Sequence, residues 1–380
     1  MRVAIIHDWL NQVGGAERVL SALKELYPQA PIYTSIYWPE VMPHNFRFWD
    51  IRPSFMDRLP LVKRRHQLFL PLYPLAFESF DLRDYDLIVS NKSGFCHGVI
   101  APPEALHICY CLTTTRYLWD FHSYVQREEV SRLVRAFLAP FLFYLRLWDR
   151  AAADRVDHFI AISSAVQSRI AKYYRRDSAV IHPPVDTASY EAYFSPDGHD
   201  DYFLIASRLI PYKRIDLAVQ AFNELGLPLV IVGEGRDRPR LEALARPNIE
   251  FKGRVSEEEL KSYVARCRAF IFPGLEDFGI APVEAQAAGR PVIAYAGGGA
   301  LDTVLEGVTG TFFREQTPQA LAEAVRNFED SRFDPETIRR HASRFDRETF
   351  KQRLSRFIEE KYDTHKRMLR CAALSEAPRT

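Results

Sequence analysis

The sequence predicts an α/β protein of two domains, each built on a doubly wound parallel sheet, and three observations carry this prediction. Short runs rich in Val, Ile and Phe alternate with segments of helical period along the whole chain. The length of 380 residues exceeds one ordinary domain and suits two. A proline-containing break, HPPVD at 182–186, separates the two halves. Because such alternation is typical of parallel sheets covered by helices on both faces, each half is expected to form one domain.

The predicted strands lie in order along both halves. In the first half they are residues 2–7, 31–36, 46–51, 86–90, 106–111, 157–162 and 178–182. In the second half they are residues 202–207, 228–232, 249–252, 269–272, 291–295 and 310–313. Between them, RIDLAVQAFNEL places Ile215, Val219, Phe222 and Leu225 on one helical face. Ser256 and Glu259 have the spacing of a capping box at the start of another helix.

The domain boundary is predicted at the two prolines of HPPVD, after which a polar stretch leads to Tyr202. The predicted domains are residues 1–186 and 187–345, facing each other across a central cleft. Residues 346–380 are expected to form a last amphipathic helix and a frayed tail.

Composition limits the partners and the location. Lys and Arg total 50 against 49 Asp and Glu, so the net charge gives no reason to expect nucleic acid binding. Five Cys without a C-x-x-C pair are typical of buried free thiols in a reducing compartment. The chain starts with a strand-like run instead of a signal peptide, and no apolar stretch is long enough to span a membrane. The predicted location is the cytoplasm, with peripheral contact to the inner face of the membrane left open.

Two basic and aromatic stretches bear on that membrane contact. Residues 117–150 are dense in aromatic and aliphatic side chains and carry Arg132, Arg135, Arg146 and Arg150, and residues 59–77 pair a basic cluster with similar bulk. Such stretches bind anionic headgroups or a lipid-linked acceptor, but ordinary helix packing with solvated charges produces the same pattern. Both interpretations remain open from the sequence.

Two carboxylates follow the predicted strand 269–272, in PGLEDFGIAPVEA. Ligands of open parallel sheets lie beyond the carboxyl ends of the strands, so this is where function is expected. Glu276 lies in the loop, and Glu284 lies eight residues on, inside a helix. The backbone amides of Phe278, Gly279 and Ile280 at the helix start suit phosphate or sugar hydroxyls, and Glu284 can accept hydrogen bonds from ribose.

Two cations follow the predicted strand 202–207, in SRLIPYK. Arg208 ends the strand and Lys213 lies five residues on. Cations at this edge would bind a diphosphate and neutralise the negative charge that grows as it departs.

Two weaker signals complete the candidate site. Gly14 and Gly15 follow the first strand and could bring the backbone close to donor phosphates, although a glycine pair can also be a simple turn. Arg254 and Val255 follow the strand 249–252 and could frame a nucleobase, or form a turn before the capped helix.

Taken together, these motifs resemble the retaining glycosyltransferases of family 4, which have the GT-B fold. The resemblance extends from IIHDWLNQVGGAERV through SRLIPYKRIDLAVQAF and VIVGEGRDRPRLEAL to LEDFGIAPVEAQAAGRPVIA and GGALDTVLEGVTGTFF. It implies that Arg208 and Lys213 hold the diphosphate, that Glu284 binds the ribose, and that Glu276 with the amides of 278–280 binds the donor sugar. It also implies that the final helix crosses back onto the first domain.

The first half is most similar to members that transfer mannose from GDP-mannose in polysaccharide or O-antigen assembly, through SNKSGFCHGVI, ALHICYC and TRYLWD. A saccharide or lipid-linked acceptor is the implied partner. Such relatives carry His, which touches the donor sugar, where this chain has Leu112, followed by Thr-Pro where it has two threonines. His97 and His107 lie nearby in sequence but do not occupy the motif position.

The predicted mechanism needs neither a metal nor another cofactor. The departing diphosphate accepts the proton of the acceptor on the same face of the sugar, while cations and helix amides stabilise the growing charge. A D-x-D pair on a divalent ion is the competing mechanism. Asp84 and Asp86 have that spacing, but they precede a strand and are interpreted as a solvated turn.

Three alternative functions remain open. GEGRDR, with Gly233 and Gly235, resembles part of a dinucleotide motif of oxidoreductases, but Arg238 stands where the third glycine belongs. A nucleotide-sugar epimerase or hydrolase would share the fold and the donor. A scaffold subunit would keep the fold without catalysis.

Overall fold

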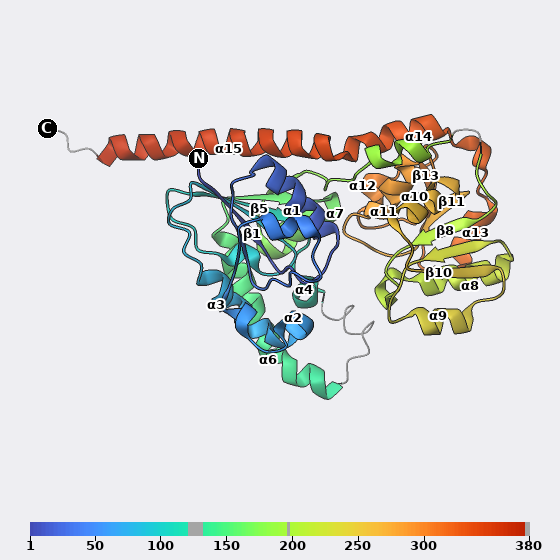
Figure 1. Ribbon diagram of the computed structural model, residues 1–380, viewed down its shortest axis with the longest axis horizontal. Helices are drawn as coiled ribbons and strands as arrows, with labels where there is room; N and C mark the ends of the chain where they lie inside the picture. The colour runs from blue at the N-terminus through green and yellow to red at the C-terminus, as the bar shows by residue number, and fades with distance from the viewer. Residues whose placement is uncertain (121–131, 196–197, 377–380) are drawn as a thin grey trace. The chain divides into compact units, whose positions relative to one another are not determined.

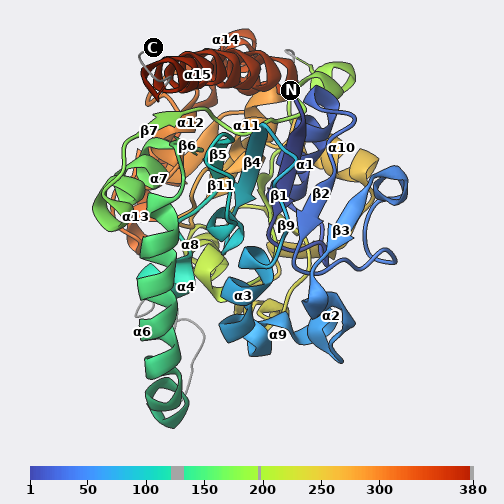
Figure 2. The same ribbon diagram turned by 90° about the vertical axis from the view of Figure 1, so that its left-hand side faces the viewer.

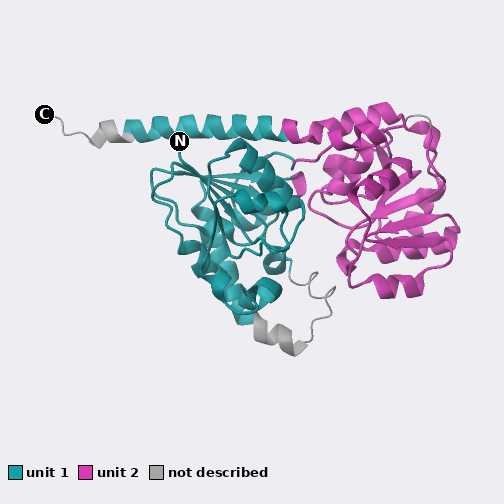
Figure 3. Cartoon of the chain, viewed as in Figure 1, with its two compact units in different colours: residues 1–162, 166–183, 350–380 teal, residues 163–165, 184–349 magenta. Residues whose placement is uncertain are grey.

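The computed structural model, drawn in Figure 1, describes residues 1–120, 132–195 and 198–376. The chain divides into two compact units, coloured separately in Figure 3. Unit 1 comprises Met1–Ile162, Val166–Pro183 and Phe350–Thr380, and unit 2 comprises Ser163–Ala165 and Pro184–Thr349. Each unit is described by itself below.

Unit 1 is built on a parallel sheet of seven strands in the order β3-β2-β1-β4-β5-β6-β7. The strands are β1 (Val3–His7), β2 (Ile32–Thr34), β3 (Ile51–Pro53), β4 (Leu87–Lys92), β5 (Leu106–Cys111), β6 (His158–Ala161) and β7 (Ser178–Val180). All residues of β1, β4 and β5 are buried, as expected for central strands with both faces covered. The mainly apolar residues of β1 and β5 and the apolar first half of β4 explain why the sequence predicts the central strands well.

The α-helices described in and next to unit 1 are α1 (Gly15–Leu26), α2 (Val62–Arg65), α3 (Tyr73–Glu78), α4 (Arg116–Trp119), α6 (Arg132–Asp154), α7 (Ser164–Arg169) and α15 (Arg347–Glu376). In Figure 2 the helices α2, α3 and α6 gather at one end of unit 1, and α15 runs along the opposite end. From Phe350 onward α15 contacts unit 1. Lys351 Nζ lies 3.0 Å from Glu25 Oε2, and His365 Nε2 bonds the carbonyl of Glu104 at 3.0 Å.

Unit 2 is built on a parallel sheet of six strands in the order β10-β9-β8-β11-β12-β13. The strands are β8 (Phe203–Ala206), β9 (Leu229–Val232), β10 (Ile249–Gly253), β11 (Ala269–Phe272), β12 (Val292–Tyr295) and β13 (Gly310–Phe313). The α-helices described are α8 (Ile215–Leu225), α9 (Arg238–Leu244), α10 (Glu257–Arg266), α11 (Ile280–Ala287), α12 (Ala300–Thr303), α13 (Pro318–Arg326) and α14 (Pro335–Ala342). The predicted face of α8 packs into the core, and the capping box of Ser256 and Glu259 is present.

One predicted strand is wrong. Residues 46–51 were expected to form a strand, and Phe46 and Phe48 do alternate with polar residues there, but His44–Phe48 forms a 3₁₀ helix and the short edge strand β3 follows it. Phe46 is buried and packs against Trp49 with ring centroids 4.1 Å apart and the rings tilted by 35°, whereas Phe48 is 77% exposed. The alternation therefore reflects one core contact and not a sheet face. The other predicted strands are confirmed, with ends that agree to within two residues.

Two further features concern the thiols and the membrane. The five cysteines are free, and four are buried as predicted, but Cys371 lies exposed on α15. Among the described residues, no helix has both the length and the apolar character needed to cross a bilayer.

The two sheets share one topology, and each sheet has a point at which the winding direction of its strands reverses. The first strand of each sheet pairs with the second strand on one side and the fourth on the other, so the winding direction reverses between β1 and β4, and between β8 and β11. Since all pairs are parallel, the loops after these strands leave from one edge. Ligands of doubly wound sheets bind at this reversal, outside the carboxyl ends.

Candidate functional site

Lys213 and Glu276 meet at the reversal point of unit 2. Lys213 lies in the loop after β8, and Glu276 lies in the loop after the neighbouring strand β11. Lys213 Nζ is 2.5 Å from Glu276 Oε1, and the two side chains are 14% and 18% exposed. The sequence predicted both residues as part of one site, and the structure brings them into direct contact.

The two loops that carry this pair are packed backbone to backbone. Lys213 ends a short 3₁₀ helix (Pro211–Lys213), and Arg214 then takes a left-handed conformation with φ of 54° before α8 begins. A Cβ atom at Gly274 would lie 2.9 Å from the carbonyl oxygen of Lys213. Gly274 therefore permits the close approach that holds Lys213 beside the Glu276 loop.

Arg208 lies exposed just after β8, in a segment supported by Gly233 and Gly235. A Cβ atom at Gly233 would lie 1.9 Å from the carbonyl oxygen of Ser207, and one at Gly235 would lie 2.1 Å from that of Leu209. The amide of Leu209 also donates to the carbonyl of Glu234 at 2.9 Å. These glycines thus pack under the Arg208 segment, a role that the comparison with a dinucleotide motif missed.

A glycine run after β12 supports the Glu276 loop from the other side. Gly298 has φ of +63°, and a Cβ atom there would lie 2.1 Å from the carbonyl oxygen of Glu276. The amide of Gly299 donates to the same oxygen at 2.9 Å. The sequence predicted no role for these two residues, although consecutive glycines soon after a strand are a signal of close backbone approach.

The start of α11 lies beside the same loop. Gly279 is the N-cap, with φ of 89°, so the chain turns sharply from Phe278 into the helix at Ile280. Phe278 is buried and packs its ring against Phe345 with centroids 5.7 Å apart. Glu284 is half-buried on α11, about one turn after Ile280. The amide cluster and Glu284 therefore lie on the element that directly follows Glu276.

Arg254 and Val255 lie on the same edge of the sheet but not beside the ion pair. They follow β10, which is an outer strand, and β9 separates β10 from β8. Two strand spacings of about 4.8 Å put the ends of β10 and β8 roughly 10 Å apart. Arg254 is exposed and Val255 is half-buried.

Gly14 and Gly15 belong to unit 1, where they follow β1 and start α1. Gly14 is exposed and extended, and Gly15 is the first residue of the helix. Behind them His7 Nε2 lies 3.3 Å from Glu17 Oε1, and both side chains are buried. That these glycines contact a donor stays a prediction.

The reversal point of unit 1 holds a carboxylate that the sequence analysis missed. Asp8, directly after β1, is 1% exposed. It accepts hydrogen bonds from the amides of Ser93, Gly94 and Phe95 at 2.6 Å each and from that of Cys96 at 2.8 Å. Four amides that could otherwise hold an external anion are thus occupied by Asp8. The cationic edge of unit 2 is the better match for a diphosphate.

The histidines and the D-x-D pair noted in the sequence do not belong to the site at the carboxyl ends of the strands. His97 and His107 are fully buried, and burial lowers the pKa of His97 well below its usual value and that of His107 to about 3, so both are neutral. Asp84 and Asp86 precede β4 and so lie at its amino end, where Asp86 accepts from the amide of Arg2 at 2.7 Å. The described residues contain no group of three or more His, Cys, Asp or Glu side chains that could hold a metal ion.

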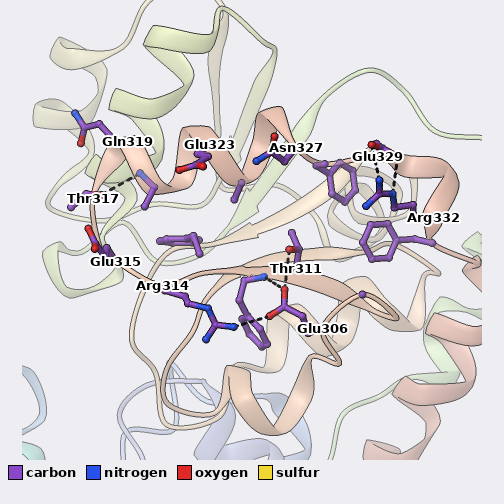
Figure 4. Close-up of a pocket in the computed structure, with 17 residues that line it drawn as sticks. Glu306, Thr311, Arg314, Glu315, Thr317, Gln319, Glu323, Asn327, Glu329 and Arg332 are labelled. Carbon is purple, nitrogen blue, oxygen red and sulfur yellow. Dashed lines mark hydrogen bonds and ion pairs between the residues drawn. The ribbon is translucent and has the colours of Figure 1, made fainter.

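A large surface hollow in unit 2 contains none of the predicted residues. It has a volume of about 700 Å³ and lies between β13 and α13, as Figure 4 shows. Its cations are paired locally: Arg314 lies 3.7 Å from Glu306, and Arg332 lies 2.7 Å from Glu329. Because β13 is the outer strand on the far side of β12 from β11, the hollow is separate from the reversal point.

Comparison with known proteins identifies the family. The family model described as "Glycosyltransferase Family 4" matches residues 13–189, and "Glycosyl transferases group 1" matches residues 189–351. The chain belongs to these glycosyltransferases. The resemblance to glycosyltransferase family 4 that the sequence indicated is therefore confirmed.

Individual relatives agree on the family but differ in the sugar. A GDP-mannose-dependent α-(1-6)-phosphatidylinositol monomannoside mannosyltransferase of Mycolicibacterium smegmatis is 31% identical over 212 residues, 46% of this chain and 54% of that protein. The D-rhamnosyltransferase WbpZ of Pseudomonas aeruginosa is 27% identical over 239 residues, 58% of this chain and 60% of that protein. The chain spans about half the length of the curated relatives it matches.

The fold is shared with solved structures. The crystal structure of Anabaena HepE in complex with UDP matches with a TM-score of 0.69 at 18% identity, covering 95% of this chain and 100% of that one. The predicted α/β GT-B fold, with two Rossmann-like parallel sheets, is confirmed.

Proposed function

We propose that this chain is a retaining hexosyltransferase that moves mannose from GDP-mannose to a saccharide or lipid-linked acceptor without a metal ion. The observation that carries the proposal is the contact between Lys213 and Glu276 at the reversal point of unit 2. An ammonium group suits the diphosphate of a nucleotide sugar, and a carboxylate suits its sugar hydroxyls. Both groups stand where doubly wound sheets bind ligands.

The proposed chemistry rests on positioning and electrostatics. Lys213 and Arg208 would stabilise the charge that develops on the departing diphosphate, assisted by the amides at the start of α11. Glu276 would orient the donor sugar, and Glu284 would accept from the ribose. On this scheme the leaving diphosphate takes the acceptor proton on the face it leaves, so the anomeric configuration is kept.

The choice of donor rests on relatives. GDP-mannose is named for the mycobacterial relative, whereas the Pseudomonas relative is a rhamnosyltransferase and HepE was solved with UDP. The sequence similarity of SNKSGFCHGVI and TRYLWD to mannose-transferring members favours GDP-mannose for this chain.

We expect GDP-mannose to stabilise the protein against thermal unfolding more than UDP-glucose, UDP-N-acetylglucosamine or ADP-glucose at equal concentration. A ligand at 100 times its Kd adds about 2.7 kcal/mol to the free energy of unfolding. The stabilisation should be the same with and without EDTA, because no metal bridges the diphosphate. If another nucleotide sugar stabilises the protein selectively, that sugar is the donor and GDP-mannose is not. Loss of the stabilisation in EDTA would contradict the metal-free mechanism.

The same preparation separates the alternative functions. A transferase consumes its donor at a rate that depends on added acceptor, whereas an epimerase or hydrolase consumes it without one. No stabilisation by any of the four nucleotide sugars would favour the scaffold function.

We also propose peripheral contact with an anionic membrane through α6 and the segment before α3. Phe143, Tyr144 and Leu147 are 53% to 62% exposed on α6, opposite the face that buries Leu142 and Leu145. A helix that is apolar on both faces usually has a partner on each. The exposed Leu61 and Leu68 flank the basic residues 63–65 before α3, and the exposed Leu75 follows in α3 itself.

The basic residues predicted along 117–150 contribute little to this proposal. Arg146 donates to the carbonyl of Leu118 at 2.6 Å, and Arg150 pairs with Asp154 at 2.5 Å. The side chains of Arg132 and Arg135 lie outside the described residues.

We expect the protein to sediment with vesicles that contain phosphatidylglycerol and not with pure phosphatidylcholine. The double variant F143S/L147S should bind at least about 10-fold more weakly, since burying each apolar side chain contributes about 1.5–3 kcal/mol. The control is Leu301→Ser, which removes a side chain of similar exposure, 56%, from unit 2. If F143S/L147S binds the vesicles as well as Leu301→Ser does, the exposed face of α6 does not contact the membrane.

A further inference from the structure

The two ends of the long stretch of unit 2, residues 184–349, lie side by side within that unit. The amide of Val185 donates to the carbonyl of Phe345 at 2.9 Å, and the hydroxyl of Thr187 donates to Asp346 Oδ2 at 2.6 Å. Val185 is completely buried. These two hydrogen bonds, called the connector clasp below, join the segment that enters the stretch to the segment that leaves it.

Asp346 also fixes the start of α15. Its second oxygen, Oδ1, accepts from the amide of Glu348 at 2.9 Å. A side-chain oxygen that accepts from an amide of the first helical turn stabilises the helix start. Both carboxylate oxygens of Asp346 are therefore used, and the backbone at Phe345, one residue before it, is held in place.

Phe345 is held from a second side by α14. Its ring lies 5.5 Å from the ring of His341, and Nε2 of His341 donates to the carbonyl of Thr303 at 3.1 Å. Burial lowers the pKa of His341, so the ring is neutral and carries its proton on Nε2. The same carbonyl accepts from Nε2 of Gln286 on α11 at 2.9 Å. The carbonyl of Thr303 thus joins α14 to α11.

The other neighbour of Phe345 is the residue that opens the amide cluster of α11. The rings of Phe345 and Phe278 have centroids 5.7 Å apart and cross at 65°, an edge-to-face geometry that is favourable for aromatic pairs. The backbone of Phe278 is packed as well, since a Cβ atom at Gly299 would lie 2.2 Å from its Cα atom. Phe278 is therefore fixed by Gly299 at its backbone and by Phe345 at its ring.

We propose that Phe345 is a positioning residue of the transfer reaction, which sets the amides at the start of α11 through Phe278 and is itself held by the connector clasp. The inference rests on the transferase function proposed above, in which these amides stabilise charge on the departing diphosphate. Because that charge grows in the transition state, a displacement of the amides lowers kcat more than it lowers the affinity for the donor.

Phe345→Leu tests the ring contact, and Phe328→Leu is its matched control. Phe345 is 3% exposed and Phe328 is 5% exposed, and Phe328 packs on Phe333 in the core of unit 2 with centroids 5.2 Å apart. Both variants keep an apolar side chain, so each should lower the Tm by about 2–6 °C. Phe328 lines the hollow beside β13, away from the reversal point.

Only Phe345→Leu is expected to lower kcat, by about 10- to 100-fold at saturating donor and acceptor and at a temperature well below both Tm values. Its Kd for GDP-mannose, measured by calorimetry, should rise by about 3-fold at most. A kcat equal to that of Phe328→Leu would overturn the inference. A loss of donor affinity as large as the loss of kcat would also contradict it, because Phe345 would then act on the bound donor as much as on the transition state.

Thr187→Val tests whether the connector clasp holds Phe345. The control is Thr311→Val, because Thr311 is also half-buried and its hydroxyl donates to Glu306 Oε1 at 3.1 Å, outside the clasp. Thr187→Val should lower kcat by about 3-fold or more, and Thr311→Val should leave it unchanged. In the double variant F345L/T187V the two losses should not multiply, because both act through one ring. A kcat for Thr187→Val equal to that of Thr311→Val would contradict the role of the clasp.

The outcomes separate this inference from the function on which it rests. A stable Phe345→Leu variant with wild-type kcat overturns the inference and leaves the transferase function intact. A wild-type protein that binds none of the nucleotide sugars would instead contradict the transferase function.

Discussion

Replacing Lys213 by alanine is expected to lower kcat by about 10²-fold or more, the usual scale for removing a group that stabilises transition-state charge. Lys213 is the cation that the structure places directly at the reversal point, in contact with Glu276. Because the diphosphate gains charge as it leaves, an ammonium group there acts more strongly on the transition state than on the bound donor. Initial rates at saturating donor and acceptor measure the effect, and Arg208→Ala tests the same role in the neighbouring position.

The matched control for Lys213 is Lys261. Lys261 on α10 is 16% exposed, pairs with Glu257 at 2.9 Å and lies over the ring of Tyr190, whereas Lys213 is 14% exposed and lies over the ring of Tyr212. Lys261→Ala thus loses a similar ion pair and a similar ring contact away from the reversal point. If Lys213→Ala and Lys261→Ala have the same kcat, the charge of Lys213 has no role in the reaction.

Glu276 provides a second check on the same pair. Removing either partner leaves the other without this ion pair, so the effects of Lys213→Ala and Glu276→Ala should not be additive. Partly exposed ion pairs stabilise a fold by at most about 1 kcal/mol. A large loss of activity with little change in stability would therefore point to a catalytic function of the pair.

The central part of each sheet could be predicted from the sequence because burial on both faces demands long apolar runs. β8, β9 and β11 are apolar runs throughout, and β1 and β5 are interrupted only by a histidine, whereas β4 is apolar only over Leu87–Val89. The edge strand β3 could not be predicted in this way, since Ile51–Pro53 is only partly buried and its sequence has no apolar pattern. The segment before β3 is shaped by the packing of Phe46 on Trp49, and the spacing of apolar residues in the sequence does not indicate this contact.

The charged residues of the candidate site could also be predicted, because they follow strands in sequence. Lys213 and Glu276 lie in the loops that follow two strands, and the rule that ligands bind at carboxyl ends was sufficient to select them. The topology was needed to show that β8 and β11 are neighbours, which turns two separate motifs into one contact.

The groups that hold the site in place could not be predicted in the same way. Asp8 binds amides 85 to 88 residues away, and Gly298 packs on a carbonyl from a different loop. Neither contact has a local pattern, because each depends on two loops that meet only in the folded sheet.

Replacing Gly298 by alanine is expected to lower both stability and kcat. A residue with φ of +63° that gains a Cβ atom costs about 1–2 kcal/mol in backbone conformation. The new Cβ atom would also lie 2.1 Å from the carbonyl oxygen of Glu276, and such overpacking costs about 1–3 kcal/mol more. The Glu276 loop must therefore move, and a shift of about 1 Å at a reacting group can lower the rate by about 10²-fold.

A variant at Gly226 separates the backbone cost of Gly298→Ala from the cost of its contact with the Glu276 carbonyl. It has φ of +69° at the end of α8, and a Cβ atom there would meet nothing within 4 Å. Gly226→Ala should thus show the backbone cost alone, with an unchanged kcat. Thermal unfolding and initial rates of both variants measure the difference. If Gly298→Ala retains the kcat of Gly226→Ala, the glycine run after β12 supports the fold of unit 2 but does not position Glu276 for the reaction.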